Sequence, residues 1–229
     1  MEIIYGLNAI TEALKAQRRT FTEIVTCRQD IKEIAALIPA PELHTVSRRD
    51  LDRMAGTPFH QGIAARVSSY PYVGLHDLVS VKILVMLDSI EDPQNLGAII
   101  RSAYALAGAG IVIPEDRSAS ITAAVVKASA GATEHARVAR VKNLRSAARD
   151  LKKNGFWLVG LEAGAGETLG SVPRFDKTVL VLGGEDTGIR PIVARELDVM
   201  ARIPMEGSFN SLNVASSAAI ALYELFMSH

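Results

Sequence analysis

Four apolar runs in the second half of the chain constrain its fold more than any other feature. The runs are Ile83–Leu87, Ile111–Ile113, Phe156–Leu161 and Thr178–Leu182. Apolar runs of this length are typical of strands that are covered on both faces, as in a parallel sheet. Helical patterns separate them, and strands that alternate with helices indicate an α/β domain. We therefore predict an α/β domain with a mostly parallel sheet from Val81 onward.

The helices of this half have recognisable start and stop signals. Asn95 is a candidate N-cap for a helix that Gly108 ends, and its expected buried face carries Ile99, Ile100, Ala103, Leu106 and Ala107. A helix at Ile121–Ser129, a strand at Ala136–Val141 and a helix at Asn143–Lys153 follow. Such sheets bind ligands in the loops at the carboxyl ends of their strands. The loops after Leu87, Leu182 and Ile203 are therefore candidate binding loops.

The first 69 residues predict a small α/β unit of their own. In order, the expected elements are a helix capped by Asn8 that ends near Gln17, a strand Phe21–Cys27, a helix Ile31–Ile38, a strand Leu43–Val46, a helix from Ser47 to Gly56 and a strand Ile63–Val67. Residues 70–80 contain Pro71 and Gly74 and have no clear period. We predict one domain at residues 1–70, a linker at 71–80 and a second domain at 81–229.

Composition excludes several classes of protein. A chain of 229 residues with 48% hydrophobic content can bury a core. It has no apolar run of the roughly 18–20 residues that a membrane span needs, and its first residues lack the basic and apolar regions of a secretion signal, so we expect no such signal. A single cysteine, Cys27, excludes an internal disulfide and a cysteine-rich metal site, so we expect a cytoplasmic protein with no bound metal. The net charge is zero, so any nucleic-acid contact must come from local patches.

The loop after Ile203 is unusually polar for a segment between two buried elements. It contains Ser208, Asn210, Ser211 and Asn213, and Asn213 is a good N-cap for the helix that follows. Polar side chains in such a place need hydrogen-bond partners, and a bound ligand is one possible partner. A polar turn that ends in a helix cap is the simpler alternative.

The loop after Leu182 is rich in glycine and runs from Gly183 to Pro191. Glycine lets a backbone approach a ligand closely. The loop lacks the Gly-Lys-Ser/Thr ending of a phosphate-binding P-loop, and its Glu185 and Asp186 would repel a bare phosphate. A tight turn capped by Asp186 or Thr187 is the alternative interpretation.

A dinucleotide site is poorly supported. The run Gly108–Gly110 precedes a strand where the fingerprint should follow one, and the run Gly164–Gly166 lacks the third glycine. Arg101, by contrast, is the only charge on the apolar stretch Ala98–Ala107. Such an arginine either extends its guanidinium to solvent or binds a specific anion.

Together, these loops resemble the SpoU-type RNA ribose methyltransferases of the SPOUT superfamily. Three motifs carry the resemblance: Asn95–Arg101 preceded by Asp92-Pro93, Leu182–Gly188, and the pair Ile203–Met205 with Ser211–Val214. Their order and separation match as well. The first domain is similar to the L30e-like substrate-binding domain often fused to this family, through Tyr5–Ala9 and His60–Ile63. Ala215 departs from the family pattern, which often has serine there.

The resemblance implies a fold, a cofactor and an oligomeric state. The fold would contain a deep trefoil knot, and the protein would be an obligate homodimer with its site at the subunit interface. S-adenosylmethionine would bind in bent form among three loops, with backbone groups of Gly183, Ile203 and Leu212 at its adenine and ribose. The implied cofactor-binding residues are Leu161, Leu182, Gly183, Gly184, Ile203 and Leu212.

The reaction would be methyl transfer to a ribose 2′-hydroxyl. That hydroxyl is a poor nucleophile, so its developing negative charge must be stabilised or its proton removed. With a pKa above about 12, arginine is a poor base. We expect Arg101 to orient the hydroxyl and an adjacent phosphate through a bidentate contact. Four further residues complete the expected constellation: Asn95, Glu185, Ser211 and Asn213.

A basic run is the candidate RNA contact. It contains Arg137, Arg140, Lys142 and Arg145, continues with Arg149, Lys152 and Lys153, and has only Asp150 as an opposing charge within it. A solvated helix face is the alternative.

The small domain favours ribosomal RNA, specifically 23S rRNA methylated at a guanosine, as the substrate. A tRNA methyltransferase, a catalytically silent RNA-binding assembly factor and a nucleotide-dependent enzyme are the competing hypotheses.

Overall fold

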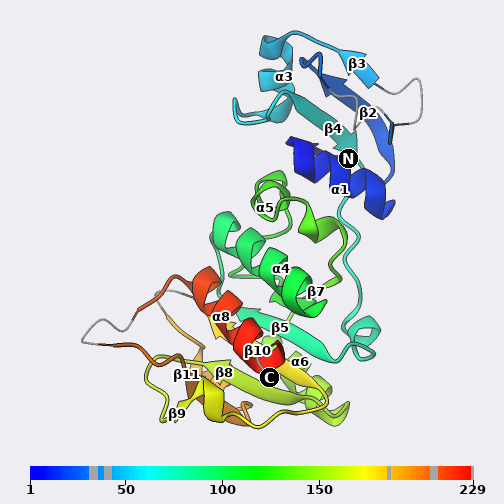
Figure 1. The fold of residues 1–229 in the computed structure, drawn as a ribbon. Helices are drawn as coiled ribbons and strands as arrows, with labels where there is room; N and C mark the ends of the chain where they lie inside the picture. The colour runs from blue at the N-terminus through cyan, green and yellow to red at the C-terminus, as the bar shows by residue number, and fades with distance from the viewer. Residues whose placement is uncertain (31–35, 39–42, 185–186, 207–210, 228–229) are drawn as a thin grey trace.

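The structure is a computed structural model that describes residues 1–30, 36–38, 43–184, 187–206 and 211–227 (Figure 1). Its first unit is a four-stranded sheet of order β1-β4-β2-β3, in which β4 pairs antiparallel with β1 and β2, and β2 pairs parallel with β3. The elements are β1 (Glu2–Tyr5), α1 (Leu7–Ala16), β2 (Phe21–Thr26), β3 (Leu43–Thr45), α3 (Arg48–Ala55) and β4 (Ile63–Val67).

The helix boundaries of this unit test two predicted caps. The cap at Ser47 is confirmed, since its hydroxyl accepts from the Asp50 backbone N–H at 3.2 Å. Gly56, with φ +66°, ends the same helix as expected. The cap at Asn8 is wrong, because Gly6 at φ +101° turns the chain directly from β1 into α1. The helix expected at Ile31–Ile38 falls mostly outside the described residues.

The second unit is a seven-stranded sheet of order β7-β6-β5-β10-β8-β11-β9, and every neighbouring pair is parallel. This confirms the predicted α/β class. Its strands are β5 (Ile83–Asp88), β6 (Gly110–Pro114), β7 (Val138–Val141), β8 (Trp157–Leu161), β9 (Glu167–Thr168), β10 (Thr178–Gly183) and β11 (Val199–Arg202). Its α-helices are α4 (Pro93–Ala107), α5 (Ala123–Ala128), α6 (Leu144–Lys153), α7 (Pro191–Ala194) and α8 (Val214–Phe226), and short 3-10 turns lie at Leu75–Leu78, Ala132–Glu134 and Leu169–Ser171.

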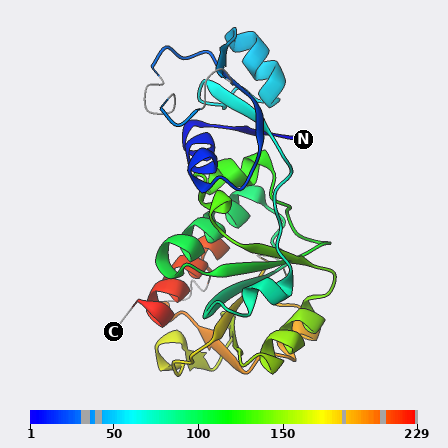
Figure 2. The same ribbon diagram turned by 90° about the vertical axis from the view of Figure 1, so that its right-hand side faces the viewer.

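Helices cover both faces of this sheet, which explains its apolar strands. In Figure 2, α4 and α8 lie on one side of the sheet and α6 on the other. Alternate residues of β5 face the two sides: Val85 and Leu87 pack into the core under α4, α5 and α8, whereas Leu84 and Met86 pack into the core under α6 and α7. Both faces of a central strand are therefore buried, and the polar site must lie at the strand ends.

The start of α4 differs from the sequence-based expectation. Asp92 caps this helix, because its carboxylate accepts from the backbone N–H groups of Gln94 and Asn95 at 3.1 and 3.2 Å. Pro93 occupies the first turn, where its missing N–H has no intrahelical partner to lose. Asn95 therefore lies inside the first turn, and its side chain is available for contacts outside the helix.

Buried polar contacts join the two units. The Arg19 side chain is fully buried and lies 3.0 Å from both the Glu134 and Glu2 carboxylates. Tyr70 donates its hydroxyl to the Thr133 carbonyl at 2.9 Å. Burial raises the pKa of Glu134, and the Arg19 charge opposes that rise. In the segment expected to be a linker, Val73 bridges to Ala139 of the large sheet, so part of it packs against the second unit.

Within the described part of the chain, no helix combines the length and the hydropathy that crossing a membrane requires.

Candidate active site

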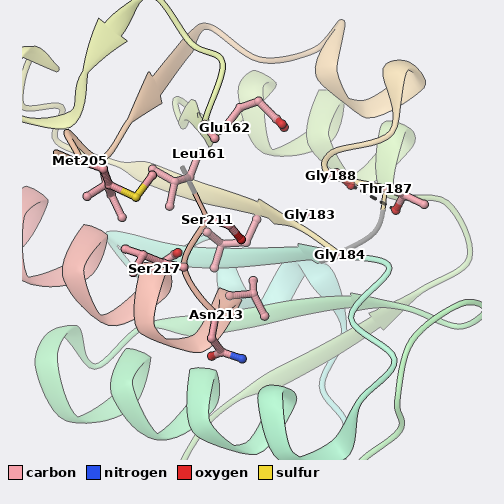
Figure 3. A pocket seen from close by; sticks show the side chains of 15 residues that line it. Leu161, Glu162, Gly183, Gly184, Thr187, Gly188, Met205, Ser211, Asn213 and Ser217 are labelled. Atoms are coloured by element: carbon pink, nitrogen blue, oxygen red, sulfur yellow. Dashed lines mark hydrogen bonds between the residues drawn. The ribbon is translucent and has the colours of Figure 1, made fainter. Parts of the chain in front are cut away.

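A cavity of about 570 Å³ opens at the carboxyl ends of β8, β10 and β11, where a parallel sheet is expected to bind ligands. Its size lies within the usual range of small-molecule sites, about 300–1,000 Å³. The predicted cofactor-binding residues all line it: Leu161, Leu182, Gly183, Gly184, Ile203 and Leu212. Three loops that are far apart in the sequence therefore meet around one space (Figure 3).

The glycine-rich loop is shaped by close backbone approaches. A Cβ atom at Gly183 would overlap the backbone of Gly188 and Ile189, and one at Gly184 would lie 2.5 Å from the Ser89 carbonyl oxygen. Gly188 has φ +58° and donates its backbone N–H to the Gly184 carbonyl at 2.9 Å. These contacts bring Gly188 against Gly183 and Gly184. At Gly183 and Gly184, only backbone atoms border the cavity.

The loop after β8 is held by backbone contacts with β11. Glu162 donates its N–H to the Ala201 carbonyl at 3.0 Å. Arg202 donates from Nη1 to the carbonyl oxygens of Ala165 and Gly166 at 2.6 and 2.7 Å. The cavity wall formed by Leu161 and Glu162 is therefore fixed to the neighbouring strand.

Asn213 connects two of the predicted motifs. Its side-chain oxygen accepts from the N–H groups of Ala215 and Ser216 at 2.9 and 3.3 Å, which confirms it as the N-cap of α8. Its amide nitrogen donates to the side-chain oxygen of Asn95 at 2.9 Å. In Figure 3 the Asn213 side chain points toward α4, below the cavity. One asparagine thus both starts α8 and fixes the position of Asn95.

A second cavity, of about 650 Å³, adjoins the first and shares Gly184, Thr187 and Val214 with it. Asn95 lines this second cavity, and so does Arg190. Asp88, which is fully buried at the end of β5, accepts from Arg190 Nε at 2.6 Å. The two cavities together form a larger site than the sequence motifs outline.

The structure brings together part of the expected catalytic constellation. Ser211 and Asn213 line the first cavity, and Asn95 contacts Asn213 from the second. Glu185 lies outside the described residues, as do Ser208 and Asn210. Arg101 is exposed on α4 and lines neither cavity of its own chain. The guanidinium therefore does not meet the other predicted residues within one chain.

The expected basic run is largely occupied by contacts within the chain. Arg137 and Arg140 donate to the backbone carbonyls of Asp77 and Glu115 at 3.2 and 3.0 Å. Arg145 lies 2.7 Å from Glu196, and the hydrogen bonds that Arg145 and Arg149 donate hold the pKa of Glu196 below its ordinary value. Asp150 is the only opposing charge within the run, and sequence reasoning missed Glu196 and Asp198 opposite it.

The reason for that error is tertiary. Glu196 and Asp198 come from the segment between α7 and β11, and Asp198 lies 2.6 Å from Lys152. The fold brings this segment against α6, although it lies more than forty residues further along the chain than the residues it pairs with. Lys142 differs from its neighbours, because it is exposed and lines a third cavity.

Sequence reasoning gave no individual ligand contact to several residues that line the first cavity. Thr187 and Met205 lie within the quoted motifs, whereas Ser217 lies outside them. Ser217 stands four residues after Asn213, so helical periodicity on α8 could have found it. The contact between Asp88 and Arg190 joins the end of β5 to the start of α7, and no local signal indicates it. Among the described residues, no group of three or more His, Cys, Asp or Glu side chains could hold a metal ion.

Fold and site define the class: a parallel α/β protein with a ligand cavity at the carboxyl edge of its sheet and a small α/β unit before it. The family model described as the SpoU rRNA Methylase family matches residues 82–223. A second model, described as RNA 2′-O ribose methyltransferase substrate binding, matches residues 3–73. The chain therefore belongs to the SpoU family of RNA methyltransferases, as the three motifs predicted.

Individual relatives agree with this assignment. An uncharacterized tRNA/rRNA methyltransferase of Synechocystis sp. is 38% identical over 99% of this chain, which spans 62% of that relative's length. The 23S rRNA (guanosine-2′-O-)-methyltransferase RlmB of Nitrosomonas europaea is 36% identical, with 100% of this chain and 92% of the relative covered. The SpoU methyltransferase AviRb of Streptomyces viridochromogenes, solved in complex with AdoMet, shares the fold at a TM-score of 0.82 and 22% identity, over 98% of this chain and 88% of that one.

Proposed function

We propose that this chain transfers a methyl group from S-adenosylmethionine to a ribose 2′-hydroxyl of RNA, with a guanosine of 23S rRNA as the target. The observation that carries the proposal is the meeting of three separate motifs at one cavity, joined by the contact between Asn213 and Asn95. The Nitrosomonas relative, which is named for this activity and aligns with the whole chain, supports the choice of substrate.

The first cavity suits the cofactor. Gly183 and Gly184 border it at positions where a Cβ atom has no room, so the backbone approaches a ligand closely there. Leu161, Leu182, Ile203 and Leu212 add an apolar lining that suits an adenine ring. The cofactor, when bound, supplies an electrophilic methyl group, and the protein supplies position and electrostatics. The Streptomyces relative was solved with this cofactor, which agrees with the assignment.

The polar residues have positioning roles in this proposal. Asn213 is fixed by its own helix, so it holds Asn95 in a defined orientation at the border of the two cavities. Ser211 and Glu185 complete the ribose contacts. Arg101 binds the hydroxyl and a neighbouring phosphate and stabilises the negative charge that develops on the oxygen, while that phosphate or a neighbouring group accepts the hydroxyl proton.

Arg101 reaches these groups from a second protomer. It is exposed on α4, one helical turn before the exposed Tyr104. On the adjacent α8, Ser216, Ile220, Tyr223 and Met227 are exposed at spacings of four, three and four residues, the stripe by which two helices pair. We therefore propose a homodimer that pairs through α8 and α4, with each site completed by its partner.

Replacing Tyr223 by glutamate is expected to convert the dimer to a monomer, because it places a charge in the centre of this stripe. Sedimentation velocity measures the change, and methyl transfer should fall with the dimer fraction. The matched control is Met200→Glu, at an exposed apolar residue of β11 that lines none of the cavities described here. A wild type that sediments as a monomer, or a Tyr223→Glu variant that stays dimeric, contradicts the proposal.

A tRNA substrate is the second candidate, because the Synechocystis relative is named for tRNA and rRNA alike. Calorimetric titration with S-adenosylmethionine, and with NAD as comparison, tests the cofactor first. Methyl incorporation from labelled cofactor into separate rRNA and tRNA pools then tests the substrate. Labelled 23S rRNA is the expected result. Labelled tRNA alone favours the second candidate, and cofactor binding without transfer to either pool indicates a silent assembly factor.

The other parts of the interpretation remain predictions. They are the deep trefoil knot, the cytoplasmic location, and the division into an RNA-binding domain at 1–70, a linker at 71–80 and a catalytic domain at 81–229. Among the expected RNA contacts, Arg137, Arg140 and Arg145 now have contacts within the chain, so Lys142 is the strongest candidate.

A further inference from the structure

The cavity that adjoins the expected cofactor site carries two arginines that the motifs do not assign. Arg117, in the loop after β6, and Arg190, just before α7, both line it. At about 650 Å³ it is large enough for a small-molecule-sized group such as one nucleotide. It shares three residues with the first cavity, so a group bound here would lie beside a ligand bound there.

Asp88 fixes the position of Arg190. The buried Asp88 accepts from both the backbone N–H and the Nε of Arg190, at 2.9 and 2.6 Å. These contacts orient the guanidinium and leave its two terminal nitrogens without a hydrogen-bond partner among the described residues. A planar guanidinium fixed at Nε presents those nitrogens in a geometry that suits a phosphate.

Two residues of this cavity have left-handed backbones, which is uncommon for residues other than glycine. Ser89 has φ +65° and Arg117 has φ +58°. Such conformations cluster at ligand sites, where the surrounding structure maintains them. The Ser89 carbonyl lies against Gly184, so its conformation is linked to the glycine-rich loop. This observation is independent of charge and indicates the same cavity.

The basic lining continues beyond the second cavity. A third cavity, of about 280 Å³, shares Arg117 and Arg190 with the second and adds Lys142 and Arg145. Arg145 is paired with Glu196, whereas Arg117 and Lys142 have no ion pair with the residues that the structure describes. The cavities therefore follow one another, from the expected cofactor site past Arg117 and Arg190 to Lys142.

Acidic side chains also lie along this path, and the structure holds them in different ways. The Asp88 carboxylate binds Arg190, and both oxygens of Asp92 cap α4. Glu91, which lines the second cavity, and Asp116, which lines the third, are exposed. Arg117, Lys142 and the terminal nitrogens of Arg190 thus present donors in cavities that three exposed carboxylates, Glu91, Asp92 and Asp116, also line.

We propose that a single strand of RNA crosses this path, with the reacting nucleotide in the second cavity. Arg117 and Arg190 bind the phosphates that flank it, and Lys142 binds the phosphate of a neighbouring nucleotide. The proposal rests on the proposed function, because the second cavity is an acceptor site only if the first holds the methyl donor. It adds the route of the substrate and three residues that would set RNA affinity.

The test measures how RNA affinity depends on salt. The probe is a fluorescein-labelled single-stranded RNA of about 12 nucleotides and mixed sequence, a length within the usual range of single-strand sites. Full-length wild type, Arg117→Gln and Lys142→Gln are titrated between about 50 and about 200 mM salt. Lys82→Gln is the matched control, since Lys82 is exposed just before β5, whereas the cavities lie at the carboxyl ends of the strands. Thermal unfolding checks that each variant is folded.

Each of the two path variants is expected to weaken binding and to flatten the plot of log K against log salt by about 0.7, the value for one lost phosphate contact on a single strand. Lys82→Gln should match the wild type. The proposal is overturned if either path variant keeps the wild-type slope, if Lys82→Gln loses as much as they do, or if the wild type does not bind the probe.

Separate titration of the wild type with S-adenosylmethionine distinguishes a failure of the RNA path from a failure of the proposed methyltransferase function. A protein that binds the cofactor but fails the salt test lacks this RNA path and keeps its proposed function. A protein that does not bind the cofactor loses the proposed function, whatever the salt test gives.

Discussion

Replacing Arg101 by lysine is expected to lower the rate of methyl transfer by about 10²–10³-fold, the usual cost of losing one donor to a developing oxyanion. Lysine keeps the positive charge but cannot form the planar, two-pronged contact of a guanidinium. Cofactor affinity should not change, because in the proposed dimer Arg101 contacts the hydroxyl and phosphate of the RNA, whereas the cofactor cavity is lined by other residues. Stability should change by less than about 0.5 kcal/mol, since the residue is exposed on a helix.

Single-turnover kinetics with saturating cofactor measure the rate, and calorimetry measures the affinity. Arg53→Lys, on α3 of the first unit, is the matched control, because Arg53 is also exposed on a helix. A rate for Arg101→Lys within a few-fold of the wild type would remove Arg101 from the reaction. An equal loss of cofactor affinity would instead assign it to cofactor binding.

Replacing Gly183 by alanine is expected to abolish cofactor binding and to destabilise the protein by more than about 3 kcal/mol. The added Cβ would overlap the backbone of Gly188 and Ile189, and a backbone cannot move aside as the end of a long side chain can. The loop would have to open, and the lining that Gly183 and Gly184 give the cavity would be lost.

The matched control is Gly166→Ala, in the loop after β8, where an added Cβ meets no atom within 4 Å. Chemical denaturation of both variants gives the change in the free energy of unfolding, and calorimetry gives the affinity for S-adenosylmethionine. Wild-type stability and affinity in Gly183→Ala would show that the loop does not need the close approach described here.

The contact between Asp88 and Arg190 illustrates why part of the site could not be predicted. Asp88 ends β5 and Arg190 precedes α7, 102 positions further along the chain, and each is unremarkable in its local sequence. Glu196 is a second example. It forms ion pairs with Arg145 and Arg149 of α6, although it lies far from them along the chain. A run of basic residues can be read from the sequence. Whether those residues are available to bind RNA depends on which acidic residues the fold places beside them.

The sequence by itself determined the α/β class, most strand positions, the caps at Ser47 and Asn213 and six of the residues that line the first cavity. These follow from local physics, because apolar runs, caps and glycine turns act over a few residues. Only the tertiary structure decided that Arg101 lies away from the cavities of its own chain, and that Arg117, Arg190 and Lys142 follow one another beside the cofactor pocket. Each of these depends on contacts between segments whose distance in space no local pattern records.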